Sequence, residues 1–142
     1  MYYSLFIGSK VKIFVTDEFE EFMKLANVND SMINQVAKEL DGGLHDGNLD
    51  MNKLFKKRIA SPGISKRNAN RSVVALQKGD RIFFIAGWRK CDIPKKGKEI
   101  PNKLLEAYKL FGESLRNLTE EQIQTNILEK LLREVKNVLF AD

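Results

Sequence analysis

The sequence predicts an α+β fold in which helices near both ends of the chain flank a strand-rich middle. Three observations support this class: apolar residues recur at helical spacing between residues 16 and 42, β-branched and aromatic runs separated by turns occupy residues 54–88, and helical spacing returns after residue 100. The length of 142 residues corresponds to a single domain with its own hydrophobic core.

The first third of the chain is predicted to form one strand and two helices. Residues 10–15, K-V-K-I-F-V, alternate and are β-branched, which is typical of a strand. Thr16 or Asp17 then caps a short helix, and residues 29–31 cap a second helix that ends at Gly42. The apolar positions at helical spacing are Phe19, Phe22, Met23 and Ala26 in the first helix and Met32, Ile33, Val36, Ala37 and Leu40 in the second. Together the helices form an αα-hairpin.

Three strands are predicted in the middle of the chain, at residues 54–60, 71–77 and 81–88. Turns at residues 61–63 and 78–80 separate them, whereas residues 65–70 and 89–98 are expected to be basic loops. The segment from His45 to Asp50 is expected to be a surface loop. The run R-I-F-F-I-A-G-W at residues 81–88 is apolar without alternation, which favours a central strand covered on both faces.

Two helices are predicted in the C-terminal part. Pro101 suits a first helical turn, and the apolar residues that follow at helical spacing are Leu104, Leu105, Tyr108, Phe111 and Leu115. A capping box at residues 119–122 opens a last helix that is expected to reach Leu139. Its apolar stripe consists of Ile123, Ile127, Leu131, Val135 and Val138. This stripe fits either core packing or an interface with a second copy or a partner helix.

Composition excludes several classes of function. The single cysteine, Cys91, and the single histidine, His45, exclude an intramolecular disulfide, a cysteine-rich zinc module and a histidine-based metal cage. The chain carries no Gly-rich phosphate-loop motif, and we expect neither a metal nor a cofactor. No segment approaches the roughly 18 apolar residues of a membrane span, and residues 1–7 lack the charged start of a signal peptide. These features predict a cytoplasmic protein that does not enter the membrane.

The basic residues are concentrated in the middle of the chain. Residues 53–98 contain 14 lysines and arginines and two acidic residues, a net charge of +12, whereas the rest of the chain carries −7. Because these cations fall on several predicted elements, they favour a surface that binds a polyanion. Such a surface is also able to cleave RNA, which supplies its own nucleophile, the 2′-hydroxyl. Arginine provides fixed donors to the phosphate, and lysine transfers a proton.

Three blocks in this region follow recognisable motifs. Residues 57–66, K-R-I-A-S-P-G-I-S-K, are similar to a K-x-R-[VIL]-A-R-P-G-x-G-K block. Residues 71–76 and 78–84 are similar to Y-R-x-[IL]-[IV]-A-[YF] and G-D-R-x-F-F-[VIL]. Residues 87–90, G-W-R-K, are similar to G-F-[AS]-K, and a Leu-Leu-Glu-Ala helix start follows at residues 104–107. In these blocks the chain resembles the RelE-like toxins of bacterial type II toxin–antitoxin systems, within the wider RelE/ParE superfamily, and the likeness extends over about residues 19–115.

The resemblance implies a small twisted antiparallel sheet with the αα-hairpin packed on one face. It implies one toxin domain over residues 1–142, with a core of about residues 10–117 and a C-terminal helical extension of about residues 118–140. The implied function is a ribosome-dependent mRNA endonuclease that inhibits translation. Its implied partners are a helix-turn-helix antitoxin, mRNA and the ribosome, and either a homodimer or a hetero-oligomer with the antitoxin remains open.

The resemblance also implies roles for individual residues. Arg71 matches the arginine that opens the middle strand and would hold the scissile phosphate. Basic residues 56–58 match those of the preceding strand, which contact phosphate or transfer protons, and residues 89–90 match a basic pair after the last core strand. The catalytic candidates are Arg71, Lys57 and Lys90. The RNA-binding candidates are Lys56, Arg58, Lys66, Arg67, Arg81, Trp88 and Arg89.

The sequence departs from the family pattern at several positions. The tyrosine with which classical members orient the nucleotide has no match, because the tyrosines here are Tyr2, Tyr3 and Tyr108. Trp88 either replaces its stacking role or belongs to the core. Ser61 stands in place of an arginine, and residue 65 is serine in place of glycine. Two other functions therefore stay open: a gyrase inhibitor of the ParE branch, and a non-catalytic nucleic-acid-binding regulator with the same fold.

Overall fold

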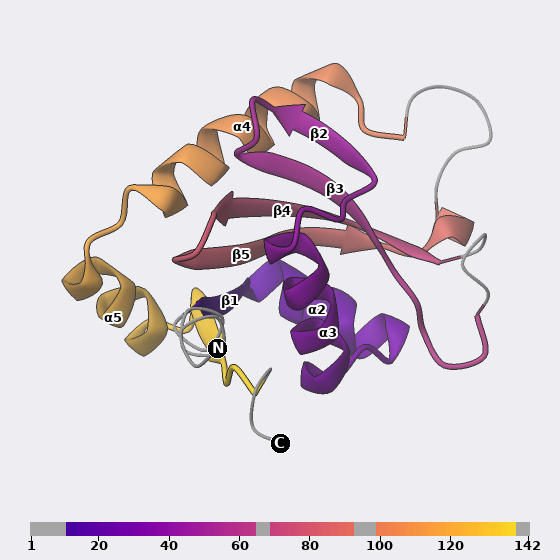
Figure 1. Ribbon diagram of the computed structural model, residues 1–142, viewed down its shortest axis with the longest axis horizontal. Helices are drawn as coiled ribbons and strands as arrows, with labels where there is room; N and C mark the ends of the chain where they lie inside the picture. Colours follow the sequence, from indigo (N-terminus) through magenta and orange to yellow (C-terminus); the bar gives the residue numbers. More distant parts are fainter. Residues whose placement is uncertain (1–10, 65–68, 93–98, 139–142) are drawn as a thin grey trace.

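The computed structural model describes residues 11–64, 69–92 and 99–138 of the chain (Figure 1). Its strands are β1 (Lys12–Thr16), β2 (Gly47–Asp50), β3 (Leu54–Ile59), β4 (Asn70–Gln77), β5 (Arg81–Trp88) and β6 (Leu132–Val135). Its helices are α2 (Asp17–Ala26), α3 (Asp30–Asp41), α4 (Asn102–Arg116), α5 (Glu120–Leu128) and the short 3-10 helix η2 (Lys90–Asp92). These elements confirm the predicted α+β class.

The strands form one sheet in the order β2-β3-β4-β5-β1-β6. Within the described residues, β1 and β5 pair in parallel and every other neighbouring pair is antiparallel. The sheet is therefore mixed at one position rather than antiparallel throughout. The helices and hairpins between β1 and β5 provide the long connection that a parallel pair requires. As predicted, β5 is a central strand, and Ile82 to Ala86 are buried.

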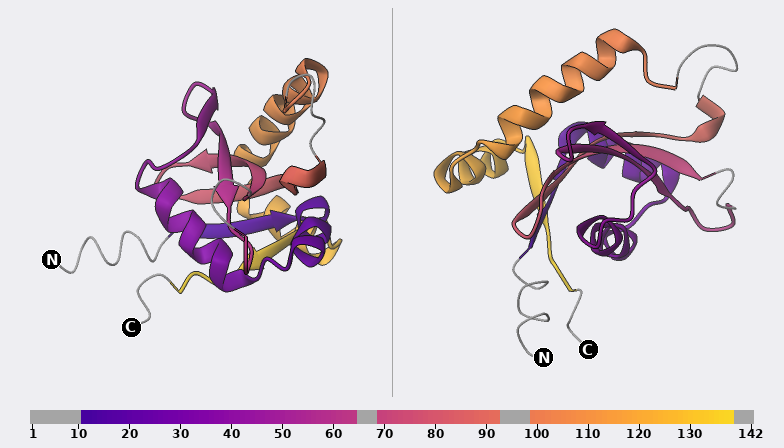
Figure 2. Two further views of the ribbon diagram at one scale, coloured as in Figure 1. Left: turned by 90° about the vertical axis from the view of Figure 1, so that its right-hand side faces the viewer. Right: turned by 45° about the horizontal axis from the view of Figure 1, so that its top comes forward.

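Helices cover both faces of the curved sheet (Figure 2). On one face, α2 and α3 pack as the predicted αα-hairpin, with Phe19 and Ile33 buried against Phe84 and its neighbours. On the other face, α4 and α5 contribute Leu115 and Ile123 to a second apolar cluster. Successive side chains of a strand point to opposite faces, so each strand contributes residues to both clusters.

The N-terminal helices begin where their capping residues predicted. The Thr16 side chain accepts a hydrogen bond from the Phe19 amide, and the Asn29 side chain accepts one from the Met32 amide. Thr16 Oγ1 also donates to the Ile85 carbonyl at 2.7 Å, which ties the start of α2 to the central strand.

Strand β2 lies where the sequence predicted a surface loop. Gly47–Asp50 pair with β3, and Met51 and Asn52 form the connection with left-handed φ angles of 43° and 64°. The Asp46 carboxylate accepts the Arg58 amide at 2.7 Å beside this pairing. A strand of four largely polar residues carries too little alternation to be recognised from sequence.

The last predicted helix is wrong beyond Leu128. Lys130 has a left-handed φ of 62°, and residues 132–135 form β6, which pairs with β1 in antiparallel register. Leu132 and Val135 are buried, and Asn34 of α3 donates to the Lys136 carbonyl. Of the apolar residues expected in one helical stripe, Ile123 and Ile127 lie in α5 and Val135 lies in the edge strand β6, whereas Leu131 and Val138 flank that strand. None of the helices in the described part of the chain is long and apolar enough to span a membrane.

Candidate nucleic-acid interface

Four of the predicted site residues lie on one face of the sheet, at the end nearest the start of α4. In the strand register, Arg58 on β3 is opposite Arg71 on β4, and Arg71 is opposite Trp88 on β5. Residues directly opposite each other across neighbouring strands project to the same face. Lys56 precedes Arg58 by two residues and therefore shares that face. We refer to Lys56, Arg58, Arg71 and Trp88 as the strand cluster.

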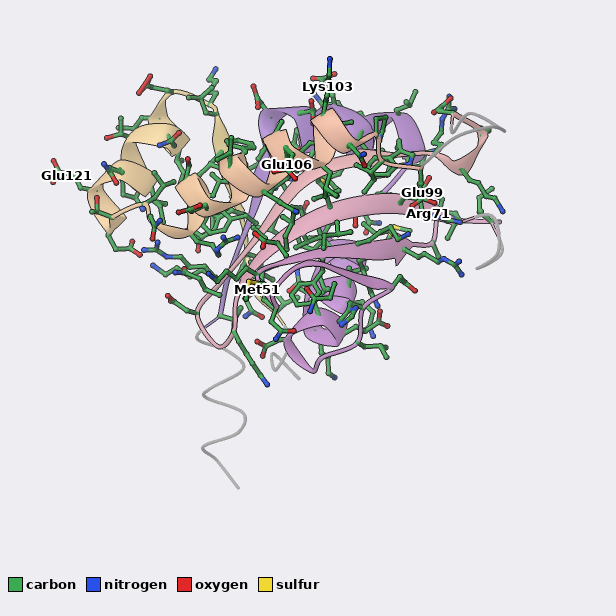
Figure 3. All side chains as sticks on the ribbon, turned by 90° about the horizontal axis from the view of Figure 1, so that it is seen from above. Met51, Arg71, Glu99, Lys103, Glu106 and Glu121 are labelled. Atoms are coloured by element: carbon green, nitrogen blue, oxygen red, sulfur yellow. The ribbon has the colours of Figure 1, made fainter. Side chains whose placement is uncertain are left out.

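A carboxylate that the sequence analysis did not single out joins this cluster. Glu99 Oε1 lies 3.5 Å from Lys56 Nζ, and Glu99 Oε2 lies 3.4 Å from Arg71 Nε. The Glu99 side chain is 26% exposed. Figure 3 shows Arg71 and Glu99 side by side at this end of the sheet, next to the first turn of α4. The cluster thus combines cations that attract phosphate with one acidic group.

The guanidinium of Arg71 is held in place from two sides. Arg71 is only 5% exposed, its Nη1 donates to the Ala69 carbonyl, and its Nε donates to Glu99. A planar guanidinium fixed in this way presents its donors in a defined direction, which suits bidentate contact with a phosphate.

An open pocket of about 410 Å³ adjoins the strand cluster and is lined by Trp88, Glu99, Leu104, Tyr108 and Glu18, among others. Tyr108 comes from α4 and Trp88 from β5, so two aromatic side chains border the same space. Burial, together with the nearby Glu18 carboxylate, raises the pKa of Tyr108 to about 12. Burial and the neighbouring Asp17 charge also raise the pKa of Glu18.

Tyr108 was placed by its spacing on the correct helix, but its position beside Trp88 depends on how α4 crosses the sheet. This crossing is fixed by close packing at Gly112. A Cβ built at Gly112 would lie 3.2 Å from Leu54 Cδ1, and the neighbouring Arg116 donates to the Lys53 carbonyl at 3.1 Å. The sequence contains no local signal for this contact.

Lys57, a predicted catalytic residue, lies on the opposite face of the sheet from Arg71. Its side chain is buried, and Nζ is 2.9 Å from Glu39 Oε1 of α3. It borders a second pocket of about 580 Å³ that His45 and Asp46 also line. The structure therefore does not bring Lys57 into the strand cluster. Strand alternation, which places Lys56 and Lys57 on different faces, already contains this information.

The remaining predicted residues lie in other places. Arg81, at the far end of β5, donates to the Leu118 carbonyl at 2.6 Å and pairs with Glu120 at 2.9 Å. Arg89 pairs with Asp92 at 2.9 Å, and Lys90 begins η2 after the last residues of β5. Lys66 and Arg67 lie outside the described residues.

No group of three or more histidine, cysteine, aspartate or glutamate side chains in the described ranges is arranged to hold a metal ion. His45 instead lies with its ring 4.6 Å from that of Phe55. The chemistry that the strand cluster offers is electrostatic stabilisation of a phosphate by arginine and lysine, aromatic stacking, and proton transfer by lysine or glutamate.

The chain was compared with models of protein families and with curated proteins. A family model described as the RelE toxin of the RelE/RelB toxin–antitoxin system matches residues 11–135. No curated protein matches the chain. The matched span runs from the residue before β1 to the last residue of β6, so it contains every strand and helix that the structure describes. The C-terminal strand β6 is therefore inside the matched region.

Proposed function

The chain belongs to the family of RelE toxins of RelE/RelB toxin–antitoxin systems, and we propose that it inhibits translation as a ribosome-dependent mRNA endonuclease. Membership of this family makes it the toxin of a pair and implies an antitoxin partner. The observation that carries the proposed activity is the row of Arg58, Arg71 and Trp88 across three neighbouring strands, with Lys56 on the same face.

The proposed reaction uses the 2′-hydroxyl of the RNA as nucleophile. Arg71 holds the scissile phosphate and stabilises the charge that develops on its oxygens, and Arg58 binds a neighbouring phosphate. Trp88 and Tyr108 border the adjoining pocket and stack on a base. Attack by the 2′-hydroxyl leaves a 2′,3′-cyclic phosphate on one product and a 5′-hydroxyl on the other.

The ribosome is proposed to supply the orientation of the substrate. Fixing reacting groups in a near-attack geometry lowers a barrier by up to about 7–11 kcal/mol in well-aligned systems. The pocket beside the strand cluster is open, so free RNA gains little of this advantage. We therefore expect almost no cleavage of naked RNA. A cytoplasmic location is part of this proposal, since the ribosome is the target.

The antitoxin is proposed to be of the helix-turn-helix type. It is proposed to neutralise the toxin by covering the strand cluster or the C-terminal helices. The net charge of +12 over residues 53–98 favours an acidic binding segment, and opposite charges would speed the encounter. If the antitoxin does not contact the strand cluster in the complex, neutralisation must instead keep the toxin away from the ribosome.

The test is to induce the protein in growing cells and to measure incorporation of labelled amino acids, thymidine and uridine. A fall in protein synthesis before DNA synthesis supports the proposal. An initial fall in DNA synthesis supports gyrase inhibition, and no early fall in either supports a non-catalytic binder. Purified protein is then incubated with mRNA in the presence and absence of programmed ribosomes. Ribosome-dependent products with 5′-hydroxyl ends support the nuclease, and 5′-phosphate ends contradict it.

A further inference from the structure

Glu99 reaches the strand cluster from the short segment that leads into α4. The next residue, Ile100, is buried in the apolar cluster between α4 and the sheet, and Pro101 directly precedes the helix. The Leu105 amide donates to the Pro101 carbonyl at 2.9 Å, which joins this segment to the first turn of α4. The Glu99 carboxylate is therefore held at a defined place beside Lys56 and Arg71 (Figure 3).

Attack by a 2′-hydroxyl needs a group that accepts its proton. The one histidine of the chain, His45, is on the α3 side of the sheet with its ring against Phe55. Glu18, Asp92 and Glu99 are the carboxylates that line the pocket beside the strand cluster. Among them, Glu99 is the one that contacts both Arg71 and Lys56.

The hydrogen bonds of Glu99 leave one oxygen suited to this task. Oε2 accepts from Arg71 Nε, whereas Oε1 is buried and accepts no hydrogen bond from any described residue. A buried carboxylate oxygen that is not hydrogen-bonded gains from a new donor, because its desolvation is then compensated. The hydroxyl of a bound ribose is such a donor.

We propose that Glu99 is the general base of RNA cleavage and that Lys56 is the general acid. This inference rests on the proposed nuclease function and assigns the two proton transfers of that reaction. Arg71 keeps its contact with the phosphate and does not take part in proton transfer. Glu99 and Lys56 come from different elements, the segment before α4 and strand β3, and their side chains meet beside Arg71.

The step balances in atoms and charge. Glu99 takes the 2′-hydroxyl proton as the O2′–P bond forms, and the P–O5′ bond breaks as Lys56 gives a proton to the leaving oxygen. The carboxylate becomes neutral, the ammonium becomes an amine, and the phosphate keeps a single negative charge in its cyclic form. Once the products leave, the proton returns from Glu99 to Lys56, whose Nζ and Oε1 atoms are 3.5 Å apart in the free protein.

The first experiment compares single-turnover cleavage of ribosome-bound mRNA by the wild type, Glu99→Gln and Glu106→Gln. Glu106 is exposed on α4, the helix that follows Glu99, and it pairs with Lys109, so it is the matched control. Loss of a general base lowers the rate by about 10²- to 10⁴-fold, and we expect this loss in Glu99→Gln alone, with unchanged binding to the ribosome. A Glu99→Gln rate equal to that of the wild type would overturn the assignment, and a faster rate would mean that the carboxylate blocks the phosphate site.

A second pair of variants distinguishes a loss of catalysis from a folding defect. Glu99→Asp and Glu99→Asn have nearly equal size and differ in charge, so a structural role would affect both alike. A general base predicts that the aspartate variant cleaves at least about tenfold faster than the asparagine variant. Equal rates in two folded variants would contradict the proposal. If the wild type cleaves no ribosome-bound mRNA, the result contradicts the proposed nuclease function itself.

The general-base role of Glu99 and the general-acid role of Lys56 are distinguished with a modified mRNA. This mRNA carries sulfur in place of the 5′ oxygen at the mapped cleavage site. A thiolate leaves without being protonated, so this substrate needs no general acid. We expect Lys56→Gln to be slow on the oxygen substrate and close to the wild-type rate on the sulfur substrate, whereas Glu99→Gln stays slow on both. Rescue of both variants, or of neither, would show that the roles are assigned wrongly.

Discussion

The ring of Phe22 on α2 lies against the backbone of Gly87 on β5, with no room for a side chain between them. A Cβ built at Gly87 would be 2.5 Å from Phe22 Cδ2. Gly87 directly precedes Trp88. The contact that packs α2 on the sheet therefore also fixes the backbone next to the aromatic residue of the strand cluster.

Gly87→Ala is therefore expected to destabilise the protein by about 1–3 kcal/mol, the usual result of overpacking a core. Gly42→Ala is the control, because its nearest neighbours would be at 3.5 Å and its φ of −80° suits alanine. That change should shift stability by no more than about 1 kcal/mol. Urea unfolding measures both, and equal stabilities of the two variants would contradict the close contact.

The neighbouring residues Leu131 and Leu132 test the unexpected strand β6. Leu132 is buried in the apolar cluster between the sheet and helices α4 and α5, whereas Leu131 is 46% exposed. We expect Leu132→Ala to cost about 2–5 kcal/mol in the free energy of unfolding and Leu131→Ala to cost much less. A continuous helix through this region would give a different pattern, since residues 123, 127 and 131 would then share one buried face.

The contrast between α2 and β6 shows what the sequence was able to predict. Helix α2 has a cap at Thr16 and a full apolar stripe, so local signals agree with the final structure. Strand β6 has four residues, and its apolar positions fit a helix equally well until the backbone turns at Lys130. Pairing with β1, more than a hundred residues away in the chain, decides the outcome.

The site was predictable to a similar extent. The three strands follow from patterns, so Arg58, Arg71 and Trp88 were placed on the correct elements. The register that aligns these residues across the sheet comes from the structure. The contact of Arg71 with Glu99 joins residues 28 positions apart through a segment without a periodic signal. The burial of Arg71 was equally unpredictable, because arginine is usually exposed. Hydrogen bonds to the Ala69 carbonyl and to Glu99 compensate for this burial in the folded protein.

Protonation of Asp30 at acid pH should weaken the contact between β6 and α3. Arg133 Nη2 donates to Asp30 at 2.9 Å, and this hydrogen bond lowers the pKa of Asp30 in the folded protein. A lowered folded-state pKa adds stability above the unfolded value of about 3.9, and that stability is lost as the pH falls through the folded-state pKa. We expect Asp30→Asn to lose less stability than the wild type between about pH 5 and pH 2 in urea unfolding at each pH.

Glu21→Gln is a suitable control for Asp30→Asn, because Glu21 is an exposed carboxylate of α2 that pairs with the exposed Lys24 three residues later. Its pH profile should follow that of the wild type. If Asp30→Asn shows the wild-type profile as well, the hydrogen bond from Arg133 does not contribute to acid sensitivity.

Arg71→Lys should abolish toxicity while keeping the positive charge. Lysine has no planar guanidinium, so it cannot donate two parallel hydrogen bonds to a phosphate. It also cannot donate to the Ala69 carbonyl and to Glu99 at the same positions as Arg71. Because Arg71 is buried, Arg71→Ala is expected to lower stability by about 1–3 kcal/mol as well as activity, so the lysine variant gives the clearer result. Growth after induction is the measurement, with Lys24→Arg on α2 as control. Full growth arrest by a folded Arg71→Lys protein would show that Arg71 does not hold the scissile phosphate.

Tyr108 is expected to act through its ring and not through its hydroxyl. The residue borders the pocket beside Trp88 and Glu99, and its pKa of about 12 keeps the phenol protonated throughout the neutral range. Stacking of a base on an aromatic side chain contributes about 1–3 kcal/mol, which corresponds to a loss of roughly 5- to 150-fold on removal. We therefore expect Tyr108→Ala to lower ribosome-dependent cleavage within that range and Tyr108→Phe to stay close to the wild-type rate.

The control for Tyr108 is Phe111→Ala, which removes an aromatic ring from the exposed side of α4, outside the pocket. Its rate should match that of the wild type. The wild-type and Tyr108→Phe proteins should also share one pH dependence between about pH 6.5 and pH 9, because the phenol does not titrate there. If Tyr108→Phe is as slow as Tyr108→Ala, the hydroxyl takes part in the reaction, and Tyr108 would have to be considered beside Lys56 as a proton donor to the leaving oxygen.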